Sequence, residues 1–195
     1  VQLAVDTIDK QVTKELAEDD NIKLIDYTGG NAFGDYLETL DKTIFTEKAG
    51  VNSAILDSVV DIGKVAQNIA FSASLYSGQM CTAPQNIYVS KDGVKTAEGT
   101  ISYDEVVAHI TGAIKGLCEH PKMGAGTLGA IQNDNTSKRV ESLKTGNGTL
   151  ALDSLEVTNP EFADARINTP IVLSVDSSDQ DKFLKECFGP IVMII

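Results

Sequence analysis

Short apolar runs alternate along this chain with stretches in which apolar residues recur at helical spacing. From Ile62 onward, apolar residues follow the three- and four-residue intervals that place them on one face of a helix. This stretch is followed by the run at 86–89, and the sequence closes on the apolar run 191–195. Because such runs are typical of buried strands, and their alternation with helices is typical of parallel sheets, we expect an α/β fold.

The same patterns predict the order of the elements. We expect strands at residues 1–5, 22–27, 52–56, 86–89, 149–152, 170–175 and 191–195, and helices at 9–17, 31–40, 62–73, 103–117, 136–143 and 179–185. Ser102 and Glu105 have the spacing of a capping box in front of the fourth helix. Gly78 is a suitable end for the helix before it, so we expect Cys81 in a loop.

Charge and cysteine content exclude several classes of protein. The 28 acidic residues outnumber the 16 basic ones, and the net charge of -12 argues against a nucleic-acid surface, since phosphate contacts need clustered Lys and Arg. No apolar run could span a membrane, and no signal peptide is visible. Three scattered cysteines form neither a disulfide framework nor a metal-ligand spacing. We expect a cytoplasmic protein with no metal.

Both ends of the sequence have the pattern of buried strands. The chain starts without Met inside the run 1–5 and stops inside the run 191–195. Native termini are usually polar, and a buried strand needs neighbours on both sides. We therefore expect the sequence to be a fragment of a longer chain.

Cys81 is the candidate nucleophile. It lies in the segment Ser77-Gly78-Gln79-Met80-Cys81-Thr82, where a glycine and a loop leave room for a substrate. No Lys, Arg or His lies near it in sequence, so a bound cation or backbone N–H groups would have to stabilise its thiolate. Cys118 and Cys187 are expected to be small apolar residues of the interior.

Two further elements are candidates for a site. Glu47 stands before Ala49-Gly50 and an expected buried strand, so it is either a partly buried general base or an exposed acid. Gly29 and Gly34 lie where a strand meets a helix, a place where free N–H groups can face a phosphate. Taken alone, that spacing favours a plain turn.

Four segments, in this order, resemble motifs of the aldehyde dehydrogenase superfamily. Thr28-Gly29-Gly30-Asn31-Ala32-Phe33-Gly34 is similar to its Thr-Gly-Ser-Thr-x-x-Gly turn, and Glu47-Lys48-Ala49-Gly50-Val51-Asn52 to its Glu-Leu-Gly-Gly-Lys-Asn segment. Ser77-Gly78-Gln79-Met80-Cys81 resembles its Gly-Gln-x-Cys loop, at the family's separation from the Glu segment. Glu186-Cys187-Phe188-Gly189-Pro190 resembles its Glu-x-Phe-Gly-Pro motif.

The resemblance implies roles for individual residues. Cys81 would be the nucleophile and Glu47 the general base, while Glu186 would grip the nicotinamide ribose and Phe188 would support the ring. The glycines near the cofactor phosphates would be Gly29, Gly30 and Gly34. The family also implies NAD or NADP as cofactor, an aldehyde as substrate and a homo-oligomer.

For the fold, the resemblance implies an aldehyde dehydrogenase-like catalytic domain with three layers and a mostly parallel sheet, together with the tail end of a Rossmann-like dinucleotide-binding domain. Residues 1–46 would be the C-terminal part of the dinucleotide-binding domain, and residues 47–195 a catalytic domain truncated at its C-terminus. Since most of the cofactor domain would precede Val1, we expect the chain alone to be inactive.

More narrowly, residues 45–52, 76–89 and 128–132 resemble the branch called phenylacetic acid degradation protein PaaN. That branch implies oxidation of a semialdehyde formed during phenylacetate breakdown. The chain departs from the superfamily where Gly30 replaces a Ser and where Lys48-Ala49 replaces Leu-Gly.

Other functions stay open at this point. Acyl transfer to coenzyme A would use the same thiol, although a base at Glu47 favours hydrolysis. A non-catalytic binding or assembly module would use the truncated strands to pair with a partner. A cysteine hydrolase would need His109 or His120, and each is expected to be structural.

Overall fold

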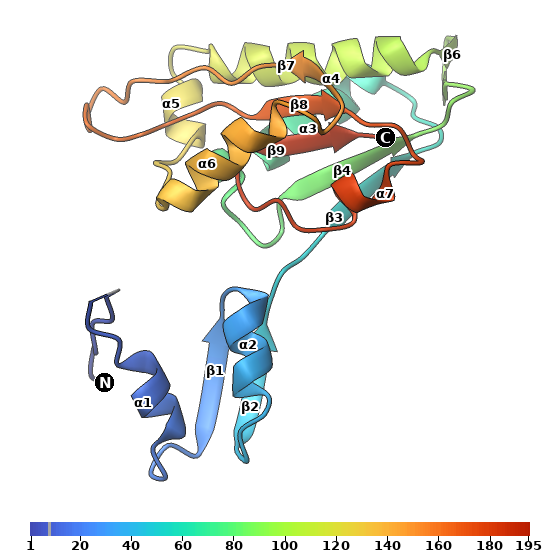
Figure 1. The fold of residues 1–195 in the computed structure, drawn as a ribbon. Coiled ribbons are helices and arrows are strands. Elements are labelled where there is room, and N and C mark those ends of the chain that lie inside the picture. The colour runs from blue at the N-terminus through green and yellow to red at the C-terminus, as the bar shows by residue number, and fades with distance from the viewer. Residues whose placement is uncertain (8) are drawn as a thin grey trace. The chain divides into compact units, whose positions relative to one another are not determined.

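The computed structural model describes residues 1–7 and 9–195, which form two compact units. The first unit comprises Val1–Ala49 and the second Gly50–Ile195. Figure 1 shows the helices and strands of both.

The first unit contains a parallel β-α-β arrangement. Its elements are α1 (Thr13–Glu18), β1 (Leu24–Thr28), α2 (Asn31–Leu37) and β2 (Thr43–Glu47). The two strands pair in parallel from Leu24 opposite Thr43 to Thr28 opposite Glu47. Parallel pairing requires a crossover connection, which α2 supplies.

The strand predicted at residues 1–5 is wrong. Residues 1–7 form neither helix nor strand, and Val1, Leu3 and Val5 are exposed. No strand in the described part of the chain pairs with this segment, so its backbone gains no ladder bonds and its apolar side chains stay in solvent. The first helix begins at Thr13 rather than at residue 9, and β2 was not predicted.

The second unit is built on a five-stranded sheet. Its strands are β3 (Asn52–Leu56), β4 (Pro84–Val89), β7 (Thr149–Leu152), β8 (Ile171–Ser174) and β9 (Ile191–Ile194). They lie in the order β3-β4-β9-β8-β7, and only β7 runs antiparallel to its neighbour. The predicted α/β fold with a mostly parallel sheet is confirmed for this unit.

Helices cover both faces of this sheet. They are α3 (Ile62–Ser74), α4 (Tyr103–Cys118), α5 (Gly124–Thr127), α6 (Asp134–Leu143) and α7 (Gln180–Phe183). A 3-10 turn, η1 (Leu75–Gly78), follows α3, and a small hairpin joins β5 (Val94–Thr96) to β6 (Gly99–Ile101). The hairpin and α5 were not predicted, and α7 is shorter than expected. Within the described residues, no helix has both the length and the apolar character needed to cross a membrane.

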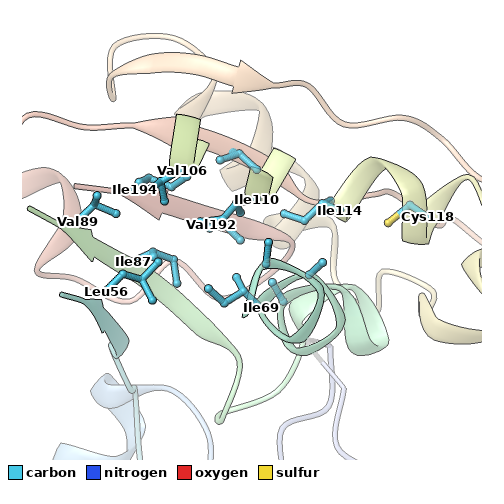
Figure 2. Close-up of a cluster of buried hydrophobic side chains, with 14 of the residues drawn as sticks. Leu56, Ile69, Ile87, Val89, Val106, Ile110, Ile114, Cys118, Val192 and Ile194 are labelled. Carbon is cyan, nitrogen blue, oxygen red and sulfur yellow. The ribbon is translucent and has the colours of Figure 1, made fainter. Parts of the chain in front are cut away.

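The sheet separates two apolar cores. Figure 2 shows the first, in which α3 and α4 pack against β3, β4 and β9. The second contains residues of α6 and α7 on the opposite face. Strand β9 serves both, because Val192 and Ile194 belong to the first core, and Ile191 and Met193 to the second. The unit therefore has three layers, with β9 in its middle.

The predicted capping box is confirmed. The Ser102 hydroxyl accepts from Glu105 N at 3.3 Å, and the Glu105 carboxylate accepts from Ser102 N at 2.7 Å. These bonds satisfy two N–H groups at the start of α4 that have no partner within the helix.

We expect Ile110→Ala to lower the free energy of unfolding of the second unit by about 2–5 kcal/mol, because Ile110 is fully buried in the first core and its loss leaves a cavity. Ile55→Ala is the matched control, since Ile55 is 79% exposed on the edge strand β3 and should change stability by less than about 1 kcal/mol. Urea unfolding measures both, and equal losses would contradict the assigned core.

Candidate active site at the amino edge of the sheet

Three segments that are distant in sequence meet where the parallel strands begin. Gly50 lies just before β3, Cys81 just before β4 and Glu186 just before β9. The amino ends of parallel strands lie at one edge of a sheet, so their preceding loops come together there.

Cys81 is exposed, in the loop between η1 and β4. Asn52 in β3 holds this loop, since its side-chain amide donates to the carbonyl of Cys81 at 2.5 Å and lies 3.2 Å from the carbonyl of Ala83. The backbone of the cysteine is therefore fixed while its thiol remains accessible.

The turn before Cys81 has an uncommon backbone conformation. Tyr76, Ser77 and Gly78 follow one another with φ values of 51°, 55° and 64°. For the two residues with side chains, this left-handed conformation costs about 1–2 kcal/mol each. The buried Ser77 hydroxyl offsets part of that cost, because it accepts from Gly129 N at 3.2 Å and lies 2.9 Å from the carbonyl of the same residue.

Gln79 ties the turn to the segment that follows α5. Its amide nitrogen donates to the carbonyls of Tyr76 at 3.1 Å and Ala130 at 2.9 Å. Its amide oxygen accepts from Gln132 N at 3.0 Å. One side chain thus uses both donors and its acceptor to keep the cysteine loop in place.

The cysteine loop touches the Glu186 segment through two glycines. A Cβ atom on Gly78 would lie 2.4 Å from the carbonyl oxygen of Gly189, closer than real contacts allow. Only a glycine at position 78 combines the positive φ with this approach of backbone to backbone.

Glu186 is half-buried and also faces the segment that precedes β3. One carboxylate oxygen accepts from Gly50 N at 3.1 Å, and a Cβ on Gly50 would lie 3.5 Å from the Cys81 carbonyl. Gly50 therefore neighbours both the Glu186 segment and the cysteine loop. A cavity of about 20 Å³, room for about one water molecule, is lined by residues that include Gly50, Gly78, Met80, Glu186 and Phe188.

Phe188 is half-buried and its backbone is anchored from α6. Arg139 donates to the Phe188 carbonyl at 2.7 Å. The side chain of Thr136, also in α6, lies against Gly189. Helix α6 therefore supports the segment that resembles the cofactor motif.

A larger cavity, about 790 Å³, lies at the carboxyl edge of the same sheet. Residues at the ends of the strands line it, among them Leu56, Val89, Ser174 and Ile195. We place the candidate site at the amino edge despite the smaller cavity there, because the exposed thiol and Glu186 lie at that edge.

Glu47 is the last residue of β2 and its side chain is exposed. Its carbonyl accepts from Gly29 N at 3.0 Å. The next residue, Lys48, pairs with Asp35 at 2.8 Å and Glu38 at 2.9 Å, and these hydrogen bonds raise the pKa of its ammonium group. Glu47 belongs to the first unit and Cys81 to the second, and Lys48 and Ala49 are the residues between Glu47 and Gly50.

The glycine turn lies between β1 and α2 in the first unit. Gly30 is the N-cap of α2, and no atom lies within 4 Å of where its Cβ would be. Gly34 is buried, with the side chains of Lys48 and Tyr27 packed over it. Gly30 thus lies in open space, whereas Gly34 allows the side chains of Tyr27 in β1 and of Lys48 after β2 to pack closely over α2.

The two histidines lie on α4 and in the turn before α5. His109 is exposed on α4, and His120 uses Nδ1 to accept from Lys122 N at 3.3 Å and Met123 N at 3.2 Å. These bonds hold the turn that leads into α5. Among the residues that the structure describes, no group of three His, Cys, Asp or Glu could hold a metal ion.

A profile of the aldehyde dehydrogenase family matches residues 2–195. The chain belongs to the aldehyde dehydrogenase family. Two curated relatives are the protein FUS7 of Gibberella fujikuroi, whose name assigns it to the aldehyde dehydrogenases, and the vanillin dehydrogenase of Corynebacterium glutamicum. The first is 28% identical over 185 residues (92% of this chain, 36% of the relative), and the second 26% identical over 184 residues (89% and 35%).

A solved structure agrees with this assignment. An NAD-dependent aldehyde dehydrogenase from Burkholderia multivorans matches with a TM-score of 0.90 and 47% identity, over 94% of this chain and 33% of that one. The chain thus spans about a third of the length of these relatives.

Four side chains that hold the loops of the candidate site were not predicted to have a role. These are Asn52, Ser77, Gln79 and Gln85. Gln85 and Asn86 could have been found as two consecutive amides inside a strand that is otherwise apolar. Buried amides need partners, and such a pair predicts that another segment crosses the strand end.

We expect Cys81 to react with a thiol reagent at least about 10-fold faster than the other two cysteines at pH 8. Cys118 is only 6% exposed and Cys187 is half-buried, and burial raises the pKa of both thiols. Mass spectrometry of labelled peptides over time measures the three rates. Cys81→Ser should remove the fast phase, and a fast phase that persists would show that another cysteine is the accessible one.

Gly78→Ala should lower the free energy of unfolding of the second unit by at least about 2 kcal/mol, because alanine must adopt a positive φ and displace Gly189. Gly112→Ala is the control, since Gly112 lies exposed in α4 with open space around it and should gain about 0.5–1 kcal/mol from helix propensity. Chemical denaturation of both variants measures the difference, and a neutral Gly78→Ala would rule out the close contact.

Proposed function

We propose that this chain carries the nucleophile of an NAD(P)-dependent oxidation of an aldehyde to a carboxylic acid, and that Cys81 is that nucleophile. The observation that carries the proposal is an exposed thiol on a loop fixed by Asn52, next to Gly50 and Glu186. Cys81 stands at the cysteine of the family's loop motif, and family membership supports the reaction class.

In the first step, the Cys81 thiolate attacks the aldehyde carbon and forms a thiohemiacetal. In the described part of the chain, no acceptor is bonded to the Cys81 N–H, which is therefore free to donate to the developing oxyanion. The hydrogen bond from the Asn52 side chain keeps the Cys81 carbonyl turned toward β3. The loop thus presents one thiol and one N–H on the same residue.

Glu186 is the residue proposed to hold the nicotinamide ribose. One of its carboxylate oxygens is engaged by Gly50 N, and the other accepts no hydrogen bond from any described residue, so it can accept from a ribose hydroxyl. This donor and acceptor set fits the cofactor. Glu186 and Phe188 would hold NAD(P)⁺, whose nicotinamide would supply the hydride acceptor for oxidation of the thiohemiacetal to a thioester.

The remaining cofactor contacts rest on the resemblance of the motifs. Phe188 is proposed to support the nicotinamide ring. Gly29 and Gly30 are proposed to lie near the pyrophosphate, and the open space at Gly30 is consistent with a close approach of backbone to ligand. Gly34 contributes by letting the side chains of Tyr27 and Lys48 pack closely over α2.

Glu47 is proposed as the general base that activates water to hydrolyse the thioester. Its side chain is exposed, so it can exchange protons with solvent. Two residues separate it in sequence from Gly50, the first residue of the second unit. The side chain of Lys48, the residue after Glu47, forms ion pairs with Asp35 and Glu38.

We also propose the domain assignment and substrate that the motifs imply. Residues 1–46 are assigned to the end of a dinucleotide-binding domain and 47–195 to a catalytic domain, and the division of the structure between Ala49 and Gly50 is consistent with a boundary near this point. The segments that resemble the phenylacetate branch favour a semialdehyde of aromatic catabolism as substrate. A relative named vanillin dehydrogenase is consistent with an aromatic context.

In the full-length protein, Cys81→Ala should lower aldehyde oxidation by roughly 10³-fold or more, because the covalent step is lost. Glu47→Gln should form the thioester but hydrolyse it slowly, so that acyl-enzyme accumulates and is seen by intact-protein mass spectrometry. Cys118→Ala is the control and should retain activity, since this thiol is buried against Ser74.

Undiminished turnover by the Cys81→Ala protein would refute the proposed nucleophile. Product analysis separates hydrolysis from acyl transfer, because free acid indicates the first and acyl-coenzyme A the second. We expect free acid, since Glu47 is retained as a candidate base.

A further inference from the structure

Gln85 is a buried amide on β4, four residues after Cys81 in sequence. It is only 6% exposed. Its amide oxygen accepts from Cys187 N at 2.6 Å, and its amide nitrogen donates to the carbonyl of Lys185 at 3.0 Å. These two backbone groups stand immediately before and after Glu186.

The Gln85 amide forms hydrogen bonds with the backbone of the Glu186 segment, as a neighbouring strand would do in a sheet. Residues 184–190 lie between α7 and β9 and belong to neither element. In the described part of the chain, Cys187 N has no other partner, and Lys185 O has one more, the Cys187 thiol at 3.7 Å. A primary amide offers one acceptor and two donors side by side, so Gln85 can satisfy the backbone on both sides of one residue.

The position of Glu186 depends on this anchor at one end and on Gly50 at the other. Its backbone is bracketed by Gln85, and its carboxylate accepts from Gly50 N at 3.1 Å. Because Gln85 and Cys81 stand on the same loop and strand, one short segment carries the nucleophile and the anchor of Glu186.

We infer that Gln85 is a positioning residue, which holds the Glu186 carboxylate where it can bind the ribose of the cofactor beside Cys81. This inference rests on the proposed function of Glu186. It assigns Gln85 no contact with substrate or cofactor, and its effect passes through Glu186 alone.

Asn86 provides a matched control in the next position. It is fully buried, and its amide nitrogen donates to the carbonyl of Phe183 at 2.8 Å, while its amide oxygen accepts from Gln85 at 3.2 Å. Gln85 also lies 3.3 Å from the Phe183 carbonyl, but of the two amides only Gln85 bonds the backbone on both sides of Glu186. Substitution of either amide removes buried hydrogen bonds and should lower stability. Only the substitution of Gln85 should change cofactor binding.

The test uses the full-length enzyme with NAD(P)⁺ and an aldehyde. Gln85→Met keeps the length of the side chain and removes the amide, and it should raise the KM for the cofactor about 10-fold while kcat changes less than about 3-fold. Asn86→Leu should change that KM less than about 2-fold at a similar loss of stability. Equal KM changes in the two variants would show a merely structural role and overturn the inference.

A double-mutant comparison tests whether Gln85 acts through Glu186. Glu186→Gln should raise the cofactor KM, and adding Gln85→Met to it should raise the KM less than about 2-fold further, because the group being positioned is already impaired. Fully additive effects would overturn the inference. If Gln85→Met does not fold, Gln85→Glu keeps the acceptor for Cys187 N but places a carboxylate oxygen at the Lys185 carbonyl, and it should show the same KM increase.

The outcomes separate this inference from the proposed function. If Glu186→Gln leaves the cofactor KM unchanged, the proposed role of Glu186 is wrong and the inference falls with it. If Glu186→Gln raises the KM and neither Gln85 variant does, the proposed function stands and only the positioning role is refuted.

Discussion

Burial of strand β9 on both faces is the constraint on which the second unit depends. Val192 and Met193 are fully buried on opposite sides of the sheet, and each such side chain contributes about 1.5–3 kcal/mol when removed from water. Because β9 pairs in parallel with β4 and β8, its start is held at the same edge as theirs. The Glu186 segment therefore reaches the cysteine loop as a consequence of how the core packs.

At this edge of the sheet, side-chain amides satisfy the backbone hydrogen bonds that neighbouring strands satisfy inside the sheet. Asn52 holds the Cys81 carbonyl, Gln79 holds the segment after α5, and Gln85 brackets Glu186. Each such bond has a modest net value of about 1 kcal/mol, but leaving its buried partners unpaired costs more. The loops can therefore carry irregular backbone, such as the left-handed turn at Tyr76 and Ser77, and still adopt one conformation.

Local patterns predicted those parts of the fold that depend on local chemistry. Strands β3 and β7 have the predicted bounds, and the capping box at Ser102 forms as expected, because periodicity and capping involve residues close in sequence. The strand expected at residues 1–5 does not form, because a strand also needs a neighbouring strand to pair with. The contact between Gln85 and Cys187 joins residues 102 positions apart, and nothing local encodes it. Sequence could name Cys81 and Glu186 as candidates, but only the sheet topology shows why their segments meet.

The separation of the two edges of the sheet has a practical consequence for engineering. The turn after β4 contains Lys91 and Asp92, both exposed, at the end of the strand opposite to Cys81. Loops of this kind tolerate insertions because few buried contacts depend on them. An affinity tag or a fluorescent peptide placed between these two residues would lie at the opposite end of β4 from the Cys81 loop.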